Sequence, residues 1–201
     1  MALVNFINLK DDKKNSILNA IELCLKNHDF DELGINDIAA AADISRGSFY
    51  NYFKDKNDAV TTMIDSKILY YVDMYKDEIT KNNGDIFNAS IEMYNDAKEI
   101  LNDVDCSTII NNLKYLVSLS VNNLKSKGFE ERLDNFLNWL IKNTKQGAKK
   151  FNTKKKMCNL LDIIVLLSLY SISQYIAIKN GNSVLYDDFE FKIEIIRNSS
   201  N

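Results

Sequence analysis

Residues 35–53 read INDIAAAADISRGSFYNYF, and this stretch decides the fold. Apolar residues recur at helical spacing in its first half and again around two phenylalanines in its second half. Asp43 and Ser45 interrupt the pattern, which predicts two short helices joined by a tight turn. The apolar anchors of this helix-turn-helix are Ile38, Ala39, Ile44, Phe49 and Phe53.

The outer face of the second helix has the chemistry of a nucleic-acid reader. A recognition helix lies in the major groove and needs small or hydrogen-bonding side chains there. Ser45 is placed to cap this helix, with free amides near a phosphate. The anchors leave a polar set for solvent or DNA: Arg46, Gly47, Ser48, Tyr50, Asn51, Tyr52 and Lys54. Alternatively, the pair packs only as core and has no DNA partner.

Helical periodicity also extends on both sides of this motif. The chain has 201 residues, 46% of them hydrophobic, and no proline, which favours long helices. A first helix is predicted from Asp11 or Asp12 to Asn27, and Asp55 is expected to cap a long helix that runs to about Lys81. Further helices are predicted over Ile86–Leu101, Thr108–Lys125, Phe129–Lys149, Thr153–Asn180 and Asp187–Arg197. Left-handed helix ends are expected at Gly84, Gly128 and Gly181.

The motif resembles the TetR/AcrR family of bacterial regulators. The match comprises Ile38-Ala39, the run from Ile44 to Phe53, and Lys56, within a resemblance over roughly residues 13–60. It implies an all-α fold of about nine helices. In this fold residues 1–55 form a three-helix, helix-turn-helix DNA-binding domain, and residues 56–201 a larger helical domain for ligand binding and dimerisation. Asp43 replaces the usual turn glycine, and aspartate tolerates left-handed geometry.

Carried over residue by residue, the resemblance implies which side chains meet DNA. Arginine pairs bidentately with guanine, glycine permits close approach, and hydroxyls set register on the backbone. The implied base contacts are Arg46, Gly47 and Ser48. The implied phosphate contacts are Ser45, Tyr50, Tyr52 and Lys56. Asn36, at the start of the preceding helix, is a candidate for a further contact.

The resemblance also implies a homodimer that binds a palindromic operator and is released by a small apolar or aromatic effector. Tyrosines and methionines suit such a pocket, although they equally suit an ordinary core. The candidate pocket residues are Met63, Tyr70, Tyr71, Met74, Tyr94 and Tyr115. The candidate dimer seam on the last two long helices is Leu133, Phe136, Leu137, Leu140, Ile164, Leu167, Ile172 and Tyr175. Repression and activation remain alternatives, with repression preferred.

Charge supports a rival function. Residues 1–60 hold seven basic and ten acidic side chains, whereas a DNA-binding module usually has a basic patch. A helical protein of the same fold that acts through protein-protein contacts, without an operator, is therefore the alternative. An enzyme is not expected, because His28 is the only histidine and no phosphate-cradling glycine loop occurs. A helical enzyme based on carboxylates stays open, and no metal or cofactor is expected.

The expected location is the cytoplasm. The three cysteines are odd in number and far apart, which is typical of reduced thiols: Cys24, Cys106 and Cys158. Residues 160–178 are apolar over nearly the length of a membrane span, but Asp162 and Gln174 lie inside the run. This pattern favours a core or interface helix over a membrane helix.

Overall fold

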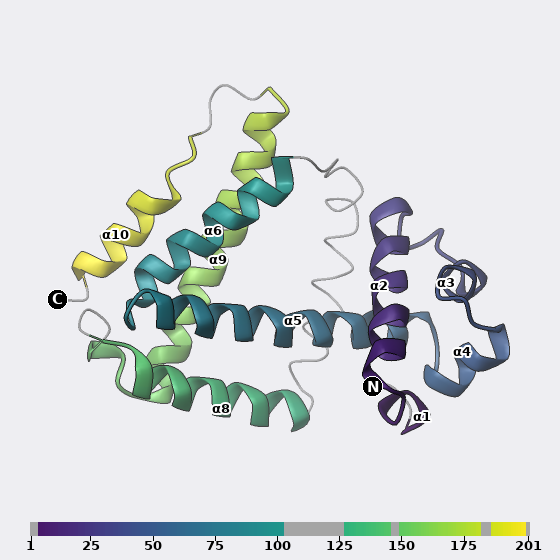
Figure 1. The fold of residues 1–201 in the computed structure, drawn as a ribbon. Coiled ribbons are helices and arrows are strands. Elements are labelled where there is room, and N and C mark those ends of the chain that lie inside the picture. Colours follow the sequence, from purple (N-terminus) through teal and green to yellow (C-terminus); the bar gives the residue numbers. More distant parts are fainter. Residues whose placement is uncertain (1–3, 103–126, 146–148, 182–185, 200–201) are drawn as a thin grey trace. The chain divides into compact units, whose positions relative to one another are not determined.

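The computed structural model describes residues 4–102, 127–145, 149–181 and 186–199. These residues form nine α-helices, one 3-10 turn and no strand, which confirms the predicted all-α class. The helices are α1 (Val4–Ile7), α2 (Asp11–Asn27), α3 (Ile35–Ala41), α4 (Arg46–Tyr52), α5 (Lys56–Lys81), α6 (Ile86–Asn102), α8 (Lys127–Asn143), α9 (Lys154–Lys179) and α10 (Phe189–Ser199), with the 3-10 turn η1 at Lys149–Phe151 (Figure 1). The predicted helix over Thr108–Lys125 lies outside the described residues, as does Cys106.

Two compact units share helix α5, and the division between them falls between Tyr70 and Tyr71. The described part of the N-terminal unit is chiefly residues 4–70. The C-terminal unit contains residues 71–102 and all the described residues from Glu130 onward. The predicted domain boundary at residues 55 and 56 coincides with the start of α5, and the N-terminal unit continues along about four turns of that helix.

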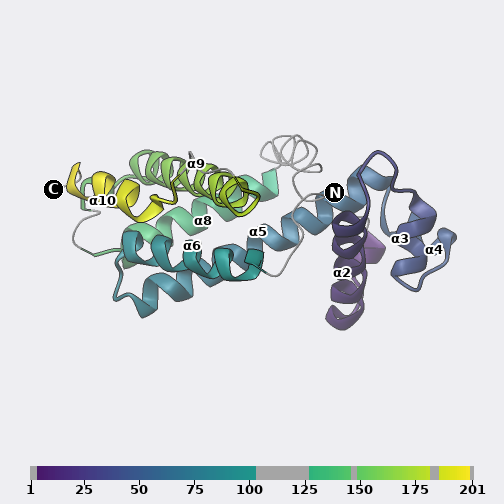
Figure 2. The same cartoon turned by 90° about the horizontal axis from the view of Figure 1, so that it is seen from above.

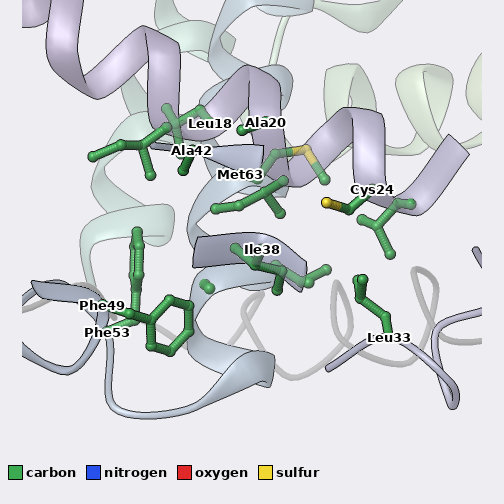
Figure 3. Packing of buried hydrophobic residues seen from close by; sticks show 14 of the residues in the cluster. Leu18, Ala20, Cys24, Leu33, Ile38, Ala42, Phe49, Phe53 and Met63 are labelled. Atoms are coloured by element: carbon green, nitrogen blue, oxygen red, sulfur yellow. The ribbon is translucent and has the colours of Figure 1, made fainter. Parts of the chain in front are cut away.

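The N-terminal unit is built around one apolar core. Figure 3 shows side chains from α2, α3, α4 and α5 converging there, including Cys24, Ile38, Phe49 and Met63. Helix α1 adds Phe6, whose ring centre is 4.8 Å from that of Phe53. This short helix was not predicted, because four residues give too little periodicity to detect.

Caps were predicted at the N-terminal ends of two helices, α2 and α5. Lys10, and neither Asp11 nor Asp12, occupies the N-cap of α2, so that cap prediction was wrong; the two aspartates lie in the first turn, where negative charge favours the helix dipole. Asp55 does cap α5, since its Oδ1 accepts a hydrogen bond from the amide of Asp58 at 2.8 Å. Helix α5 ends at Lys81, as predicted.

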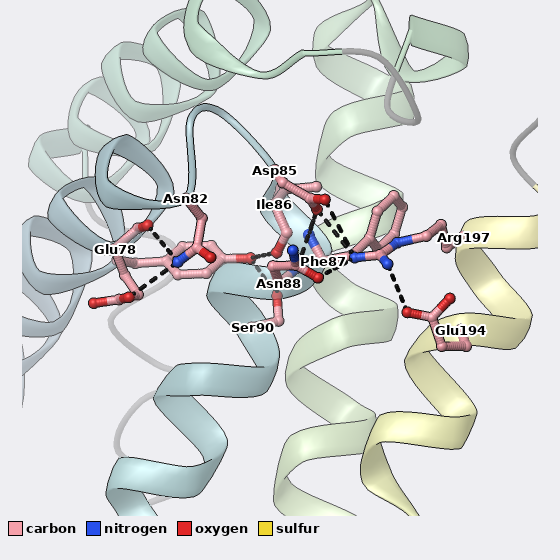
Figure 4. A network of polar contacts seen from close by, with 10 residues as sticks. Glu78, Asn82, Asp85, Ile86, Phe87, Asn88, Ser90, Glu194 and Arg197 are labelled. Carbon is pink, nitrogen blue, oxygen red and sulfur yellow. Dashed lines mark hydrogen bonds and ion pairs between the residues drawn. The ribbon is translucent and has the colours of Figure 1, made fainter.

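The C-terminal unit consists of helices packed around a second core. Helices α6, α9 and α10 pack against one another (Figures 1 and 2). Helix α8 contributes Phe136, Leu137 and Leu140. Figure 4 shows Arg197 of α10 reaching Asp85 and Asn88, at the start of α6, so that polar contacts join these helices at one end.

Two glycines of the C-terminal unit have the left-handed geometry that was predicted. The φ angle is +85° at Gly84 and +94° at Gly181. Gly128 instead lies inside α8, so its predicted role as a helix end was wrong. Helix α8 ends at Asn143, earlier than the predicted Lys149, and the hydroxyl of Thr144 donates to the oxygen of Leu140 at this end.

Helix α9 is long and apolar enough, by length and composition, to cross a membrane. Only 17% of its most apolar window is buried inside the described part of the chain. Thr153 caps the start of this helix, because its Oγ1 accepts a hydrogen bond from the amide of Lys156.

Candidate nucleic-acid interface

The turn between α3 and α4 is held by main-chain hydrogen bonds. The amide of Ile44 donates to the oxygen of Ala39 at 3.0 Å, and the amide of Asp43 donates to that of Ala40 at 3.2 Å. Asp43 has a φ of +50°, the left-handed geometry for which aspartate is one of the better-suited residues. The turn therefore forms with Asp43 at the position where the family usually has a glycine.

Aromatic side chains fix which face of α4 points outward. Phe49 and Phe53 have no exposed surface, and their ring centres are 5.4 Å apart. Because both rings are anchored in the core, the opposite face of the seven-residue helix is presented to solvent. Ser48 is half-buried, and the predicted residues that are exposed are Asn36, Ser45, Arg46, Gly47, Tyr50, Asn51 and Lys54.

Ser45 performs the predicted capping role. Its Oγ accepts a hydrogen bond from the amide of Ser48 at 3.0 Å, and the two hydroxyl oxygens are 2.9 Å apart. The cap satisfies one of the amides that the first turn of a helix leaves free, and the hydroxyl pair lies at the exposed start of α4. Both serines are thus ordered at the start of α4, where the resemblance implies contacts with DNA.

Arg46 is held by side chains from both helices. Its Nη1 donates to Oδ1 of Asn36 at 2.7 Å, and its Nη2 lies 3.5 Å from the hydroxyl of Tyr50. The guanidinium carbon is 5.7 Å from the centre of the Tyr50 ring, which adds a cation–π contact. The structure thus brings three of the predicted DNA-contacting residues together in one exposed cluster.

Two other predicted phosphate contacts face the protein. Nζ of Lys56 donates to the main-chain oxygens of Phe30 and Leu33 at 2.7 and 2.9 Å. Tyr52 is half-buried and packs edge-on against Phe6, with ring centres 6.2 Å apart. Both residues therefore stabilise the N-terminal unit, a role that the sequence pattern did not reveal because their partners lie in irregular or short segments.

Acidic residues near the motif are used as helix caps. Asp37 Oδ2 accepts from the amide of Gly34 at 2.8 Å, and Asp58 Oδ2 accepts from that of Lys54 at 2.9 Å. Residues 44–54 contain two basic side chains and no acidic one. The acidic balance of the first sixty residues therefore does not extend to the exposed face of α4.

The described candidate pocket residues are divided between the two units. Met63 belongs to the core of the N-terminal unit, whereas Tyr94 is buried in the core of the C-terminal unit. Tyr70 and Tyr71 are exposed, and Met74 is half-buried. Tyr115 lies outside the described residues.

Tyr94 takes part in a polar cluster within the C-terminal unit. Its hydroxyl donates to Oδ1 of Asp187 at 2.6 Å, and Lys98 pairs with Oδ2 of the same carboxylate at 2.7 Å. Burial, and then the hydrogen bond to Asp187, raise the pKa of the Tyr94 hydroxyl. Burial alone would raise the pKa of Asp187, but the hydrogen bonds from Lys98 and Tyr94 hold it below its usual range. The cluster joins α6 to the segment that leads into α10.

The candidate dimer seam faces the interior of its own unit. Leu140 is fully buried, and Phe136, Leu137 and Ile164 are nearly so. The remaining seam residues are half-buried, and all but Tyr175 are among those that pack against the same core: Leu133, Leu167, Ile172 and Tyr175. The exposed apolar residues of α9 lie on other faces of the helix: Ile163, Val165, Leu166, Leu169 and Tyr170.

Comparison with known proteins assigns the N-terminal unit. Residues 17–60 match the profile of the family described as "Bacterial regulatory proteins, tetR family". A search of curated proteins finds no match to the chain. The matched segment contains α3, the left-handed turn and the recognition helix α4, complete with cap and apolar anchors. The helix-turn-helix is therefore a DNA-binding domain of the tetR type, and this match supports a role for the chain as a TetR-type transcriptional regulator.

Proposed function

We propose that this regulator is a cytoplasmic repressor that binds a palindromic operator as a homodimer and is released by a small apolar or aromatic effector. The observation that carries the proposal is the exposed face of α4. Phe49 anchors one side of this helix in the core. The opposite side is exposed and carries Arg46, Gly47, Tyr50 and Asn51. Arginine and asparagine read base edges, and the glycine leaves room for close approach.

Selection from a random duplex library at low salt tests operator binding. The native chain is compared with the double variant Arg46→Ala, Tyr50→Ala. A matched control replaces one basic and one tyrosine residue of the C-terminal unit, Lys155→Ala with Tyr186→Ala, both exposed. We expect the native chain and the control to enrich one palindromic site that the first variant does not. Equal enrichment by all three chains would refute a role for this face.

The exposed apolar face of α9 supports the homodimer. Ile163, Leu166 and Leu169 are spaced three residues apart, and Leu166 is 66% exposed. A contiguous exposed apolar face is typical of an interaction surface, and a two-fold dimer would bring the same face of two chains together. Dimerisation would present two recognition helices to half-sites about one helical turn apart.

The dimer surface is tested by charge insertion. Leu166→Glu should convert a dimer into a monomer in analytical ultracentrifugation, whereas Ile100→Glu should leave the dimer intact. Ile100 is equally exposed at 67% and lies on α6 of the same unit. Two results would contradict this surface: an unchanged dimer in the Leu166 variant, or co-flotation of the native chain with lipid vesicles, which would assign α9 to a membrane.

Release by an effector would act as a population shift. A ligand that binds the C-terminal unit of one dimer arrangement more tightly than another favours that arrangement. Helix α5 belongs to both units, so a change at its C-terminal half would alter how the recognition helices are presented. Small molecules that raise the melting temperature are screened for loss of operator affinity. Binding without any change in operator affinity would exclude this mechanism.

A second candidate is a protein-binding role without an operator. It is favoured by the excess of acidic residues over residues 1–60, which weakens non-specific attraction to DNA. If the library yields no enriched sequence for the native chain, this candidate replaces operator binding.

A further inference from the structure

We propose that Asn36 is a positioning residue that acts through Arg46 and thereby sets selectivity for guanine in the operator. The inference rests on the proposed function, in which Arg46 meets a base edge. It changes the role of Asn36 from a contact with DNA to a contact that orders the residue next to it.

Asn36 and Arg46 both lie in the first turn of their helices. Asn36 is the second residue of α3, and Arg46 is the first residue of α4, ten positions later. The turn brings their side chains together, and Nη1 of Arg46 donates to Oδ1 of Asn36 at 2.7 Å. The Tyr50 hydroxyl, 3.5 Å from Nη2, flanks the guanidinium from within α4.

These contacts leave the guanidinium able to read a base. Arginine has five N–H donors in one plane, and a bidentate pair with guanine needs only two of them. A long arginine side chain loses rotamer freedom when it binds, and a side chain that is already held loses less. Asn36 therefore favours the bound geometry of Arg46 without needing to touch the base itself.

The chemistry of an amide suits this role better than that of a carboxylate. An amide oxygen accepts the hydrogen bond from Arg46 without adding a negative charge that would offset the charge of the guanidinium. The neighbouring carboxylate, Asp37, is engaged with the amide of Gly34 at 2.8 Å. Arg46 is thus oriented by a neutral partner, and its charge remains available to the DNA.

The test measures the affinity of the full-length chain for the selected operator and for operators with each base pair changed singly. The variants are Asn36→Ala, Arg46→Ala and the double variant, with Asn57→Ala as a matched control at the exposed start of α5. Arg46→Ala should abolish selectivity at one base pair in each half-site. The ratio of affinities for the native and changed base pair should fall by about tenfold to a hundredfold. Asn36→Ala should lower selectivity at that same base pair by about fivefold, and have no further effect when Arg46 is already alanine.

Different outcomes separate this inference from the proposed function. If Asn36→Ala changes selectivity at another base pair, and does so equally in the Arg46→Ala background, then Asn36 contacts DNA directly and the inference is wrong while operator reading stands. If Asn36→Ala behaves as the native chain, the inference is likewise wrong. If Arg46→Ala leaves all selectivity unchanged, base reading by Arg46 fails, and the inference with it.

A charge variant supplies a second readout. Asn36→Asp keeps an acceptor for Arg46 and adds a negative charge beside it. We expect it to keep the native base preference but to weaken binding to every duplex, with the slope of log affinity against log salt reduced by about one. Loss of the base preference in this variant would contradict a positioning role.

Discussion

The ammonium of Lys56 donates a hydrogen bond to the main-chain oxygen of Phe30 at 2.7 Å and lies 4.4 Å from the centre of the same residue's ring. The first residue of α5 is thereby tied to the link between α2 and α3. Lys54, two positions earlier, has an exposed side chain. The two lysines therefore allow a structural contribution to be separated from an electrostatic one.

Lys56→Met should lower the free energy of unfolding by about 1–2 kcal/mol, because two main-chain oxygens lose a charged donor. Lys54→Met should leave stability unchanged and reduce the salt slope of operator binding by about one. Urea unfolding and binding at several salt concentrations check both expectations. Equal stability of the two variants would show that the tie to Phe30 contributes nothing in solution.

Gly47→Ala should separate folding from DNA binding. A methyl group there would come no closer than 3.7 Å to Ser45 Oγ, an ordinary contact, and alanine is favoured over glycine in a helix by about 0.5–1 kcal/mol. We expect a slightly higher melting temperature together with weaker operator binding, because the methyl group would face the major groove in the proposed complex. Unchanged operator affinity would remove Gly47 from the interface.

Gly84→Ala should destabilise the C-terminal unit more than Gly181→Ala does. Both residues have positive φ, which costs alanine about 1–2 kcal/mol. At Gly84 the new methyl group would also lie 2.6 Å from the main-chain oxygen of Asn143, whereas at Gly181 it meets nothing within 4 Å. Urea unfolding measures the free energy of unfolding of the two variants. Similar losses would mean that the turn at Gly84 relaxes and relieves the clash with Asn143.

Asp187→Asn should destabilise the protein at neutral pH and not in acid. The pKa of Asp187 lies below its ordinary value of 3.8, so its ion pair and hydrogen bond stabilise the fold above about pH 4 and are lost as the pH falls through the lower value. We expect a loss of about 1 kcal/mol at pH 7 that shrinks below pH 4. Glu190→Gln, an exposed carboxylate on α10, is the control. A loss that is the same at pH 7 and pH 3 would exclude this source of stability.

Local signals made much of the fold predictable from the sequence. Asp55 caps α5 because its side chain reaches an amide only three residues away. Asp43 adopts a left-handed turn for reasons intrinsic to aspartate. The outward face of α4 was predictable because apolar Phe49, within the helix, and Phe53, at its C-cap, anchor the end of the helix in the core.

Contacts between elements were not predictable in the same way. The pairing of Asn36 with Arg46 depends on the angle between two short helices, which residue spacing does not determine. Helix α9 is apolar on most sides, so the stripe that faces inward is decided by how α6 and α10 pack on it. Ile164 is therefore buried while Leu166 is exposed, although both are apolar residues on the same turn.

Phe6 limits how the DNA-binding module could be transplanted into another protein. The family match begins at residue 17, but the ring of Phe6, on α1, is only 4% exposed and covers Phe53 beneath the recognition helix. A chimera that carried residues 17–60 alone would leave this ring behind and open a hole under α4. The unit to be exchanged between regulators thus starts at residue 4, thirteen positions ahead of the segment that sequence comparison marks out.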